Sequence, residues 1–205
     1  MGLSADALKH GIDSVAALEP RVAEALARAG YPPPRLSARG ATTLMRTIVG
    51  QQISFKAADS VWAKFGTIVG DTTDMAHIAA LPVETLRSAG LSGQKAGYVH
   101  SLAVHVASGA LNFEALPADD EAAIAALVAV KGIGRWSAEI YLLFAEGRSD
   151  IWPAGDLAVQ IELGRILGLD ARPTEKATRD LVEGWRPHRG ALAVFMWHHY
   201  KTPVI

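Results

Sequence analysis

The sequence predicts an all-α protein, and three observations support that fold class. Apolar residues in the alanine-rich segments recur every three to four positions, which gives a helix one apolar face. No run of alternating β-branched residues is long enough to indicate a sheet. Short segments that contain glycine, proline or helix-capping residues separate the apolar runs. With 205 residues, the chain is long enough for one domain or two small ones.

Turn and capping signals set the limits of the expected helices. Pro32 to Pro34 stop the first helix, because proline does not fit a helix interior. Pro82 begins a short helix, Ser92 caps a long one and Thr174 caps the penultimate one. In chain order, the predicted helices are 15–29, 42–53, 55–65, 75–80, 83–89, 94–108, 119–129, 135–145, 157–167, 175–183 and 188–199.

Composition narrows the class of protein. Half of the residues are hydrophobic, but no apolar stretch approaches the ~20 residues of a membrane span. The first residues mix acids and bases, unlike a secretory signal, so we expect a soluble cytoplasmic protein, associated with the nucleoid if bacterial. The net charge of −1 argues mildly against a general nucleic-acid coat protein. With no cysteine, disulfides, thiolate nucleophiles and cysteine-ligated iron–sulfur clusters are excluded.

The most informative segment lies between Leu127 and Gln160. Two helical runs flank the sequence Lys131-Gly132-Ile133-Gly134, and a lone acid, Asp156, closes the segment. We expect both glycines to use their freedom to adopt positive φ, so that the amides at the start of the second helix point at an anion. The positive end of the helix dipole favours the same contact. The natural anion for such a hairpin is a DNA phosphate.

The run V-K-G-I-G-R-W-S-A, followed by Pro-x-x-Asp, resembles the helix-hairpin-helix glycosylase superfamily (HhH-GPD), which is named for its hairpin, its Gly/Pro-rich loop and its Asp. The stretches 48–54 (IVGQQIS) and 90–96 (GLSGQKA) are similar to the 3-methyladenine DNA glycosylase II branch. The resemblance covers about residues 40 to 197. It implies a six-helix barrel-like subdomain at 41–146 that contains the hairpin, and a second helical subdomain made of 1–40 and 147–205. It also implies an active-site cleft between them, with the 147–155 loop bringing Asp156 to the cleft wall.

Asp156 occupies the position of the family's catalytic carboxylate. Hydrolysis of an N-glycosidic bond passes through an oxocarbenium-like sugar, so a negative charge near the deoxyribose and a group that orients water are both needed. One carboxylate can supply both. The alternative is that Asp156 is only a helix N-cap, since aspartate is a preferred residue there.

Trp136 stands where bifunctional members of the superfamily carry a lysine that attacks the sugar and forms a Schiff base. An indole cannot act as that nucleophile. We therefore expect water to release the base, without lyase chemistry. The alternative, a tryptophan packed in the core beneath the hairpin, leaves this inference unchanged, because the lysine is still missing.

The resemblance assigns a base pocket to Trp136, Trp197, Ile140 and Tyr141. Trp197 matches the position at which relatives present a tryptophan to the damaged base. Alkylated purines such as 3-methyladenine and 7-methylguanine are cationic, and an aromatic face attracts a desolvated cation by about 2 kcal/mol. A core position for Trp197 is the alternative. Ile140 departs from the family's aromatic residue one helical turn after Trp136, with Tyr141 beside it, which leaves the other side of the pocket open.

Flipping a nucleotide out of the duplex requires a residue that fills the gap. Gln51, Gln52 and Ser54 match the loop that supplies this wedge in relatives, with Gln52 where some have leucine; alternatively, these residues only cap and join two helices. The predicted phosphate contacts are Lys131, Gly132, Ile133, Gly134 and Arg135. Lys95 and Arg189 are further basic candidates.

These observations predict a monofunctional DNA glycosylase for alkylated purines in base excision repair. The alternatives are a helix-hairpin-helix module that binds DNA without chemistry, and a glycosylase for another lesion such as hypoxanthine or uracil. We expect a monomer that acts on double-stranded DNA, has no membrane partner and hands its product to an abasic-site endonuclease. No cofactor or catalytic metal is expected; the resemblance allows a structural monovalent cation at the hairpin carbonyls.

Overall fold

The computed structural model describes residues 2–202, and every regular element within them is helical. The predicted all-α class is confirmed. By their internal contacts, the residues divide into two compact units, Ala38–Tyr141 and the combination of Met1–Ser37 with Leu142–Ile205. The expected subdomain limits, 41 and 146, lie close to the limits of these units, and the barrel-like form of the first subdomain stays a prediction. No helix within residues 2–202 combines the length and the hydropathy of a membrane span.

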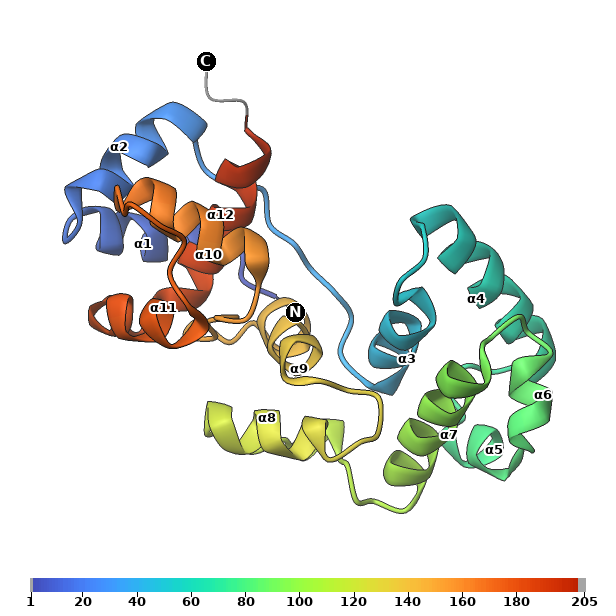
Figure 1. Ribbon diagram of the computed structural model, residues 1–205. Helices are drawn as coiled ribbons and strands as arrows, with labels where there is room; N and C mark the ends of the chain where they lie inside the picture. The colour runs from blue at the N-terminus through green and yellow to red at the C-terminus, as the bar shows by residue number, and fades with distance from the viewer. Residues whose placement is uncertain (1, 203–205) are drawn as a thin grey trace. The chain divides into compact units, whose positions relative to one another are not determined.

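The unit Ala38–Tyr141 is organised around the helix α7 (Gly93–Ala107), which packs against α3, α5 and α6 (Figure 1). The buried side chains of α7 include Val99 and Leu102, which place its apolar face in the core of this unit. The other elements of this unit are α3 (Ala41–Gly50), α4 (Phe55–Val69), α5 (Met75–Ala80), α6 (Val83–Arg87), η1 (Phe113–Ala115), α8 (Asp120–Val128) and α9 (Arg135–Tyr141).

The unit formed by the two ends of the chain is organised around α12 (Arg189–Lys201), which packs against α1, α2 and α10 (Figure 1). From Arg189 to Trp197 every residue of α12 is buried, so this helix forms the core of the unit. The other elements are α1 (Ala5–Ala16), α2 (Pro20–Ala29), the π-helical turn η2 (Leu142–Glu146), α10 (Leu157–Ile166), α11 (Glu175–Leu181) and η3 (Glu183–Trp185).

The first predicted helix, 15–29, is wrong. The structure has two helices there, because Val15 and Ala16 end α1 and Pro20 begins α2. Proline is favourable at the first position of a helix, where its missing N–H has no intrahelical partner. The Glu19 carboxylate accepts a hydrogen bond from the Arg21 backbone N–H and so caps the new helix.

The predicted helix 42–53 is too long at its C-terminal end. Helix α3 ends at Gly50, Gln51 leaves the helical conformation with a ψ of 132°, and Gln52 has a φ of 58°. Among residues 2–202, Gln52 is the one non-glycine residue with positive φ. This left-handed conformation turns the chain sharply before Ser54 caps α4, whose start at Phe55 agrees with the prediction.

Candidate catalytic carboxylate and hairpin

Asp156 is the N-cap of α10, and its carboxylate is fixed by two hydrogen bonds. Oδ1 accepts from the Val159 backbone N–H at 3.0 Å and from the Trp197 indole Nε1–H at 3.1 Å. The interpretation of Asp156 as a cap is therefore correct for the local geometry. The bond from Trp197 is additional to the backbone bond that makes Asp156 a cap. A half-buried carboxylate held in this way has a fixed direction, which a catalytic group requires.

The loop before Asp156 is held in place at several points. The Gln160 side chain donates to the Ala154 carbonyl at 2.8 Å, and the Asp156 N–H donates to the Pro153 carbonyl at 2.9 Å. Earlier in the same loop, both carboxylate oxygens of Asp150 accept hydrogen bonds from Arg189, at 2.8 and 2.7 Å. Arg189 is buried in this pair. The prediction of Arg189 as a phosphate neighbour is therefore wrong, and its role is to anchor the loop to α12.

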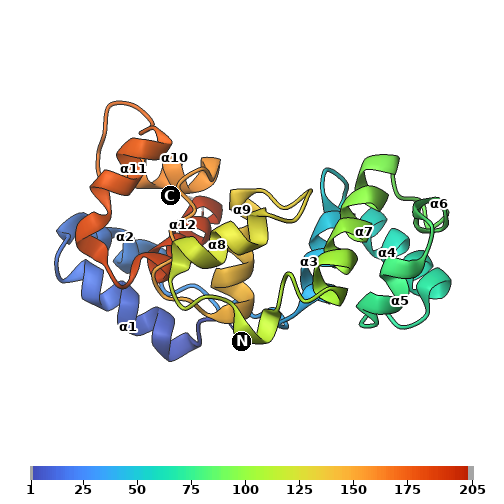
Figure 2. The same ribbon diagram turned by 90° about the horizontal axis from the view of Figure 1, so that it is seen from below.

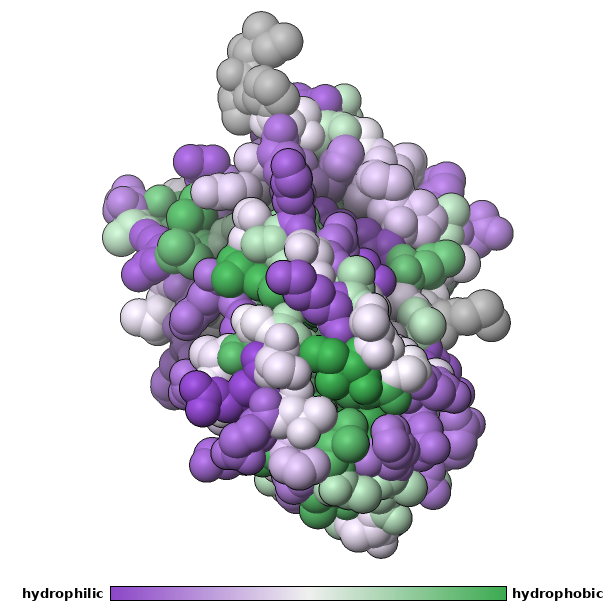
Figure 3. Space-filling view, turned by 90° about the vertical axis from the view of Figure 1, so that its right-hand side faces the viewer, coloured by the Kyte–Doolittle hydropathy of each residue, from purple (hydrophilic) through white to green (hydrophobic). Residues whose placement is uncertain are grey.

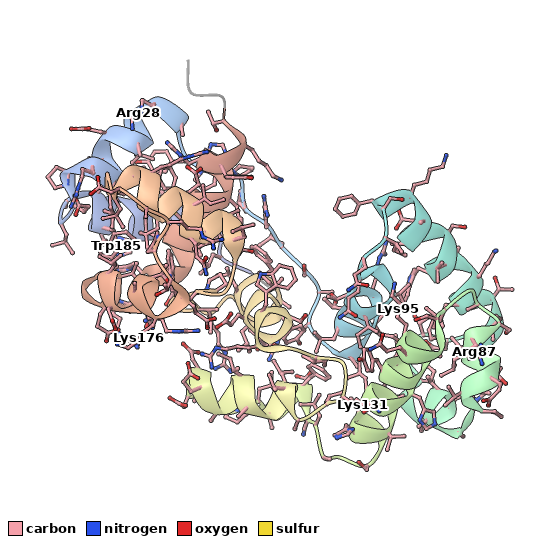
Figure 4. The ribbon with its side chains drawn as sticks, viewed as in Figure 1. Arg28, Arg87, Lys95, Lys131, Lys176 and Trp185 are labelled. Atoms are coloured by element: carbon pink, nitrogen blue, oxygen red, sulfur yellow. The ribbon has the colours of Figure 1, made fainter. Side chains whose placement is uncertain are left out.

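Trp152 adds apolar packing to the same loop. The ring of Trp152 meets that of Trp185 edge-on, with centroids 6.3 Å apart and planes at 89°. Trp185 is labelled in Figure 4. Both rings are buried. Rings in this arrangement attract each other through their quadrupoles. The loop that carries Asp156 is thus attached to the core on both sides of Pro153.

Trp197 is buried, with 9% of its surface exposed, and its ring packs against Phe144 with centroids 5.6 Å apart. We call Phe144 and Trp197 the aromatic pair. The alternative interpretation, in which Trp197 is a core residue, is correct for its burial. It did not predict the hydrogen bond that the indole N–H donates to Asp156. That bond makes Trp197 a positioning residue for the carboxylate. Its predicted stacking on a base stays a prediction.

The two hairpin glycines differ in a way that the sequence did not indicate. Gly132 has a φ of 97°, and a Cβ there would lie 2.1 Å from Cγ of Tyr98. Gly134 does not have positive φ, and a Cβ there would meet no atom within 4 Å. The expectation of positive φ at both glycines is therefore wrong for Gly134. Gly132 makes the turn, whereas Gly134 leaves open space before α9 begins.

The turn at 51–54 is bonded to the hairpin. The Gln51 amide donates to the Gly132 carbonyl at 3.4 Å, and the Lys95 ammonium donates to the Val49 carbonyl at 2.8 Å. Burial lowers the pKa of Lys95 below its ordinary value. Figure 2 shows the hairpin and this turn at the same edge of the unit, and Figure 4 labels Lys95 on α7 beside α3. The two predicted DNA-contacting segments are therefore brought together.

A surface pocket lies where these segments meet the start of α7. Its lining includes Gln51 and Gln52, Ser92 and Lys95, and the hairpin residues Gly132, Ile133 and Gly134. Ser92 caps α7 as predicted, accepting from the Lys95 N–H at 3.2 Å, and Ser54 caps α4. The capping interpretation of Ser54 is therefore correct. Gln52 is exposed, and its role as the wedge stays a prediction.

Exposed apolar side chains follow Gln52 on the same turn. Ile53 is 40% exposed, and Phe55, the first residue of α4, is 94% exposed. Figure 3 shows a face of the molecule on which hydrophobic areas are interspersed with hydrophilic side chains. The family resemblance did not predict that Phe55 is exposed beside the left-handed turn.

The basic residues of the hairpin differ in their contacts. Lys131 is exposed at the turn, as Figure 4 shows. Arg135 is bound to two carboxylates, Glu121 at 2.8 Å and Glu139 at 2.9 Å. The hydrogen bond with Glu121 and the charges of both acids raise the pKa of Arg135. Arg135 therefore holds α8 against α9, and its predicted contact with phosphate has no support in these bonds.

The remaining predicted pocket residues lie on α9. Trp136 is 46% exposed, so the alternative that places it in the core is wrong. Ile140 is half-buried. Tyr141 is buried, its ring packs against Phe113 and its hydroxyl oxygen accepts from the Gly40 N–H at 2.8 Å. These contacts give Tyr141 a structural role, and its place in a base pocket stays a prediction.

Comparisons with known proteins agree with this geometry. The chain is 30% identical over 164 residues to the alkylbase DNA glycosidase-like protein mag2 of Schizosaccharomyces pombe, covering 75% of each protein. Its fold matches the crystal structure of a DNA-3-methyladenine glycosidase from Bacillus halodurans with a TM-score of 0.85 at 28% identity, covering 94% of this chain and 89% of that one. It also matches S. pombe 3-methyladenine DNA glycosylase (Mag1) in complex with abasic DNA, with a TM-score of 0.76 at 27% identity, covering 94% and 95%.

A glycine hairpin between two helices, followed by a carboxylate that caps a later helix, defines the helix-hairpin-helix class of DNA-repair proteins. The family model of the HhH-GPD superfamily of base excision DNA repair proteins matches residues 45–187, and the chain belongs to that family. The predicted resemblance is therefore confirmed, including its 3-methyladenine glycosylase branch.

Proposed function

We propose that this chain is a monofunctional DNA glycosylase that removes alkylated purines from double-stranded DNA in base excision repair. The observation that carries the proposal is the geometry of Asp156, whose carboxylate is bonded to both the start of α10 and the indole of Trp197. A module that only binds DNA has no use for a carboxylate held by two donors from separate helices. The names of the relatives support the same substrate class.

In the proposed reaction, the bond between C1′ of the deoxyribose and the purine nitrogen breaks, and its electron pair leaves with the base. Positive charge develops on the sugar, and the Asp156 carboxylate stabilises it. A water oxygen then forms the new bond to C1′, and its proton passes to Asp156 or to solvent. A cationic purine leaves as a neutral base, so no strong general acid is required.

In this proposal, the unit Ala38–Tyr141 holds the DNA. Gly134 leaves room for a phosphate at the start of α9, while the turn at 51–54 supplies side chains that could fill the gap left by a flipped nucleotide. Within this proposal the protein acts as a monomer in the cytoplasm and passes an abasic site to an endonuclease. A structural monovalent cation at the hairpin carbonyls remains part of the proposal.

Base release decides between this function and its alternatives. The purified protein is incubated with methylated DNA and, in parallel, with unmodified, uracil-containing and hypoxanthine-containing duplexes, and released bases are separated by chromatography. We expect 3-methyladenine or 7-methylguanine to be released. Binding without release of any base would favour the non-catalytic module, and release of uracil or hypoxanthine alone would favour a glycosylase for another lesion.

A further inference from the structure

A cation of the protein itself lies over the aromatic pair. The Arg35 guanidinium carbon is 5.8 Å from the ring centroid of Phe144 and 5.9 Å from that of Trp197. Both distances fall within the range of a cation–π contact. Arg35 is exposed, whereas Trp197 is buried beneath it. All three residues belong to the unit formed by the two ends of the chain.

Backbone contacts hold the segment that carries Arg35 against Phe144. The Ser37 N–H donates to the Phe144 carbonyl at 2.8 Å. Gly2 lies so close that a Cβ there would be 2.6 Å from the carbonyl oxygens of both Arg35 and Phe144. The guanidinium is thus attached to a segment fixed beside the ring, although the segment itself has no helical structure.

The same indole therefore contacts a cation and an anion of the protein. Arg35 lies over the Trp197 ring, and Asp156 accepts from the Trp197 N–H at 3.1 Å. An aromatic face that already attracts one cation offers less to a second, because two like charges near the same ring repel each other. A neutral purine that approaches these rings meets no such repulsion.

We propose that Arg35 is a specificity-determining residue, whose positive charge over the aromatic pair lowers the excision of cationic purines relative to neutral ones. This inference rests on the proposed glycosylase function and on a base approaching Trp197. It assigns a selectivity that the aromatic pair alone would not give: the rings favour cations, and Arg35 opposes that preference.

The test changes the charge at Arg35 and measures two bases. Arg35→Gln removes the charge and keeps a polar side chain, and Arg35→Lys keeps the charge. Arg28→Gln is the matched control, because Arg28 is an exposed arginine of the same unit on α2, as Figure 4 shows. Single-turnover rates are measured for 7-methylguanine, which is cationic, and for hypoxanthine, which is neutral, on each folded variant.

We expect Arg35→Gln to raise the 7-methylguanine rate about five- to tenfold relative to the hypoxanthine rate, as removal of a partly screened repulsion would. Arg35→Lys and Arg28→Gln should leave the selectivity near that of the wild type. A 7-methylguanine rate that is unchanged or lower in Arg35→Gln, or rates that rise or fall together, would overturn the inference alone. Wild-type protein that releases neither base would overturn the proposed function itself, and the inference with it.

Discussion

Asp156 serves as a helix cap and as the proposed catalytic group, and one substitution separates the two. Asparagine caps helices about as well as aspartate, and its side-chain oxygen can still accept from Val159 and Trp197. We therefore expect Asp156→Asn to remain folded and to bind damaged DNA, but to lose roughly 10²–10⁴ of its excision rate or more. Single-turnover excision, with a melting curve and a DNA-binding titration, measures the three properties.

The control is Asp156→Ala, which also removes the cap and both bonds. It should be destabilised by about 1–2 kcal/mol, which is the usual value of an N-cap. Wild-type excision in Asp156→Asn would show that the carboxylate only caps α10.

Trp197 also has two proposed roles, which are to position the Asp156 carboxylate and to stack on the damaged base. Trp197→Phe keeps an aromatic ring but removes the N–H that binds Asp156, so excision of cationic and neutral bases should fall in equal proportion. Trp197→Ala also removes base stacking, worth about 1–3 kcal/mol, and the cation attraction, so the rate for 7-methylguanine should fall further than that for hypoxanthine.

Single-turnover rates for both bases on both variants test this assignment. Equal losses for the two bases in Trp197→Ala would leave Trp197 only its positioning and packing roles.

The sequence could predict residues whose roles are local, and it missed those whose partners are distant. Asp156 was identifiable because a cap and a family position both lie in one short segment. Arg35 gave no signal, since it lies in a segment without helical periodicity and its ring partners, Phe144 and Trp197, are over a hundred residues away. Arg189 looked like a surface base because nothing in the sequence connects it with Asp150.

At the scale of the element, we expect substitutions at the two hairpin glycines, Gly132 and Gly134, to have different effects. Gly134→Ala adds a methyl group in open space without positive φ, so the fold should be retained while affinity for an abasic-site duplex falls, because the methyl group occupies the path of a phosphate. Gly132→Ala should destabilise the unit, since its Cβ would clash with Tyr98 at a φ of 97°.

Thermal denaturation and a binding titration on both variants separate these effects. Gly66→Ala within α4 is the control for the glycine change itself, because its nearest contact, a Thr72 methyl group, would be 3.9 Å away. Unchanged affinity in a folded Gly134→Ala protein would mean that the hairpin does not hold the phosphate.

Helix boundaries show where periodicity stops being informative. The starts at Phe55 and Glu175 agree with the prediction, and Ser54 and Thr174 fix them as side-chain caps that act within three residues. The 15–29 helix failed because its apolar periodicity continues across Pro20, which can begin a new helix as readily as end an old one. The end of α3 was missed because nothing local required Gln52 to be left-handed.

At the scale of the whole molecule, borohydride reduction tests whether the protein forms a Schiff base with DNA. By the family resemblance, Trp136 stands at the position of the Schiff-base lysine, so we expect that borohydride does not trap the protein covalently on an abasic site. Gel electrophoresis of the reduced mixture, beside a bifunctional glycosylase that does trap, makes the measurement.

If a band appears, Lys95 is the first lysine to replace, because burial lowers its pKa and leaves more of the amine unprotonated. A band that one lysine substitution abolishes would contradict the hydrolytic mechanism.

The two-unit division also has a consequence for the order in which the molecule is completed. One unit is a continuous segment, Ala38–Tyr141, whereas the other joins both ends of the chain, with α1 packed against α12. During synthesis, the hairpin and its turn are finished long before Trp197 leaves the ribosome, and domains generally fold as units from the N-terminal side. A nascent chain would therefore hold the segment proposed to bind DNA before it holds a positioned carboxylate, so that excision would begin only after α12 has docked.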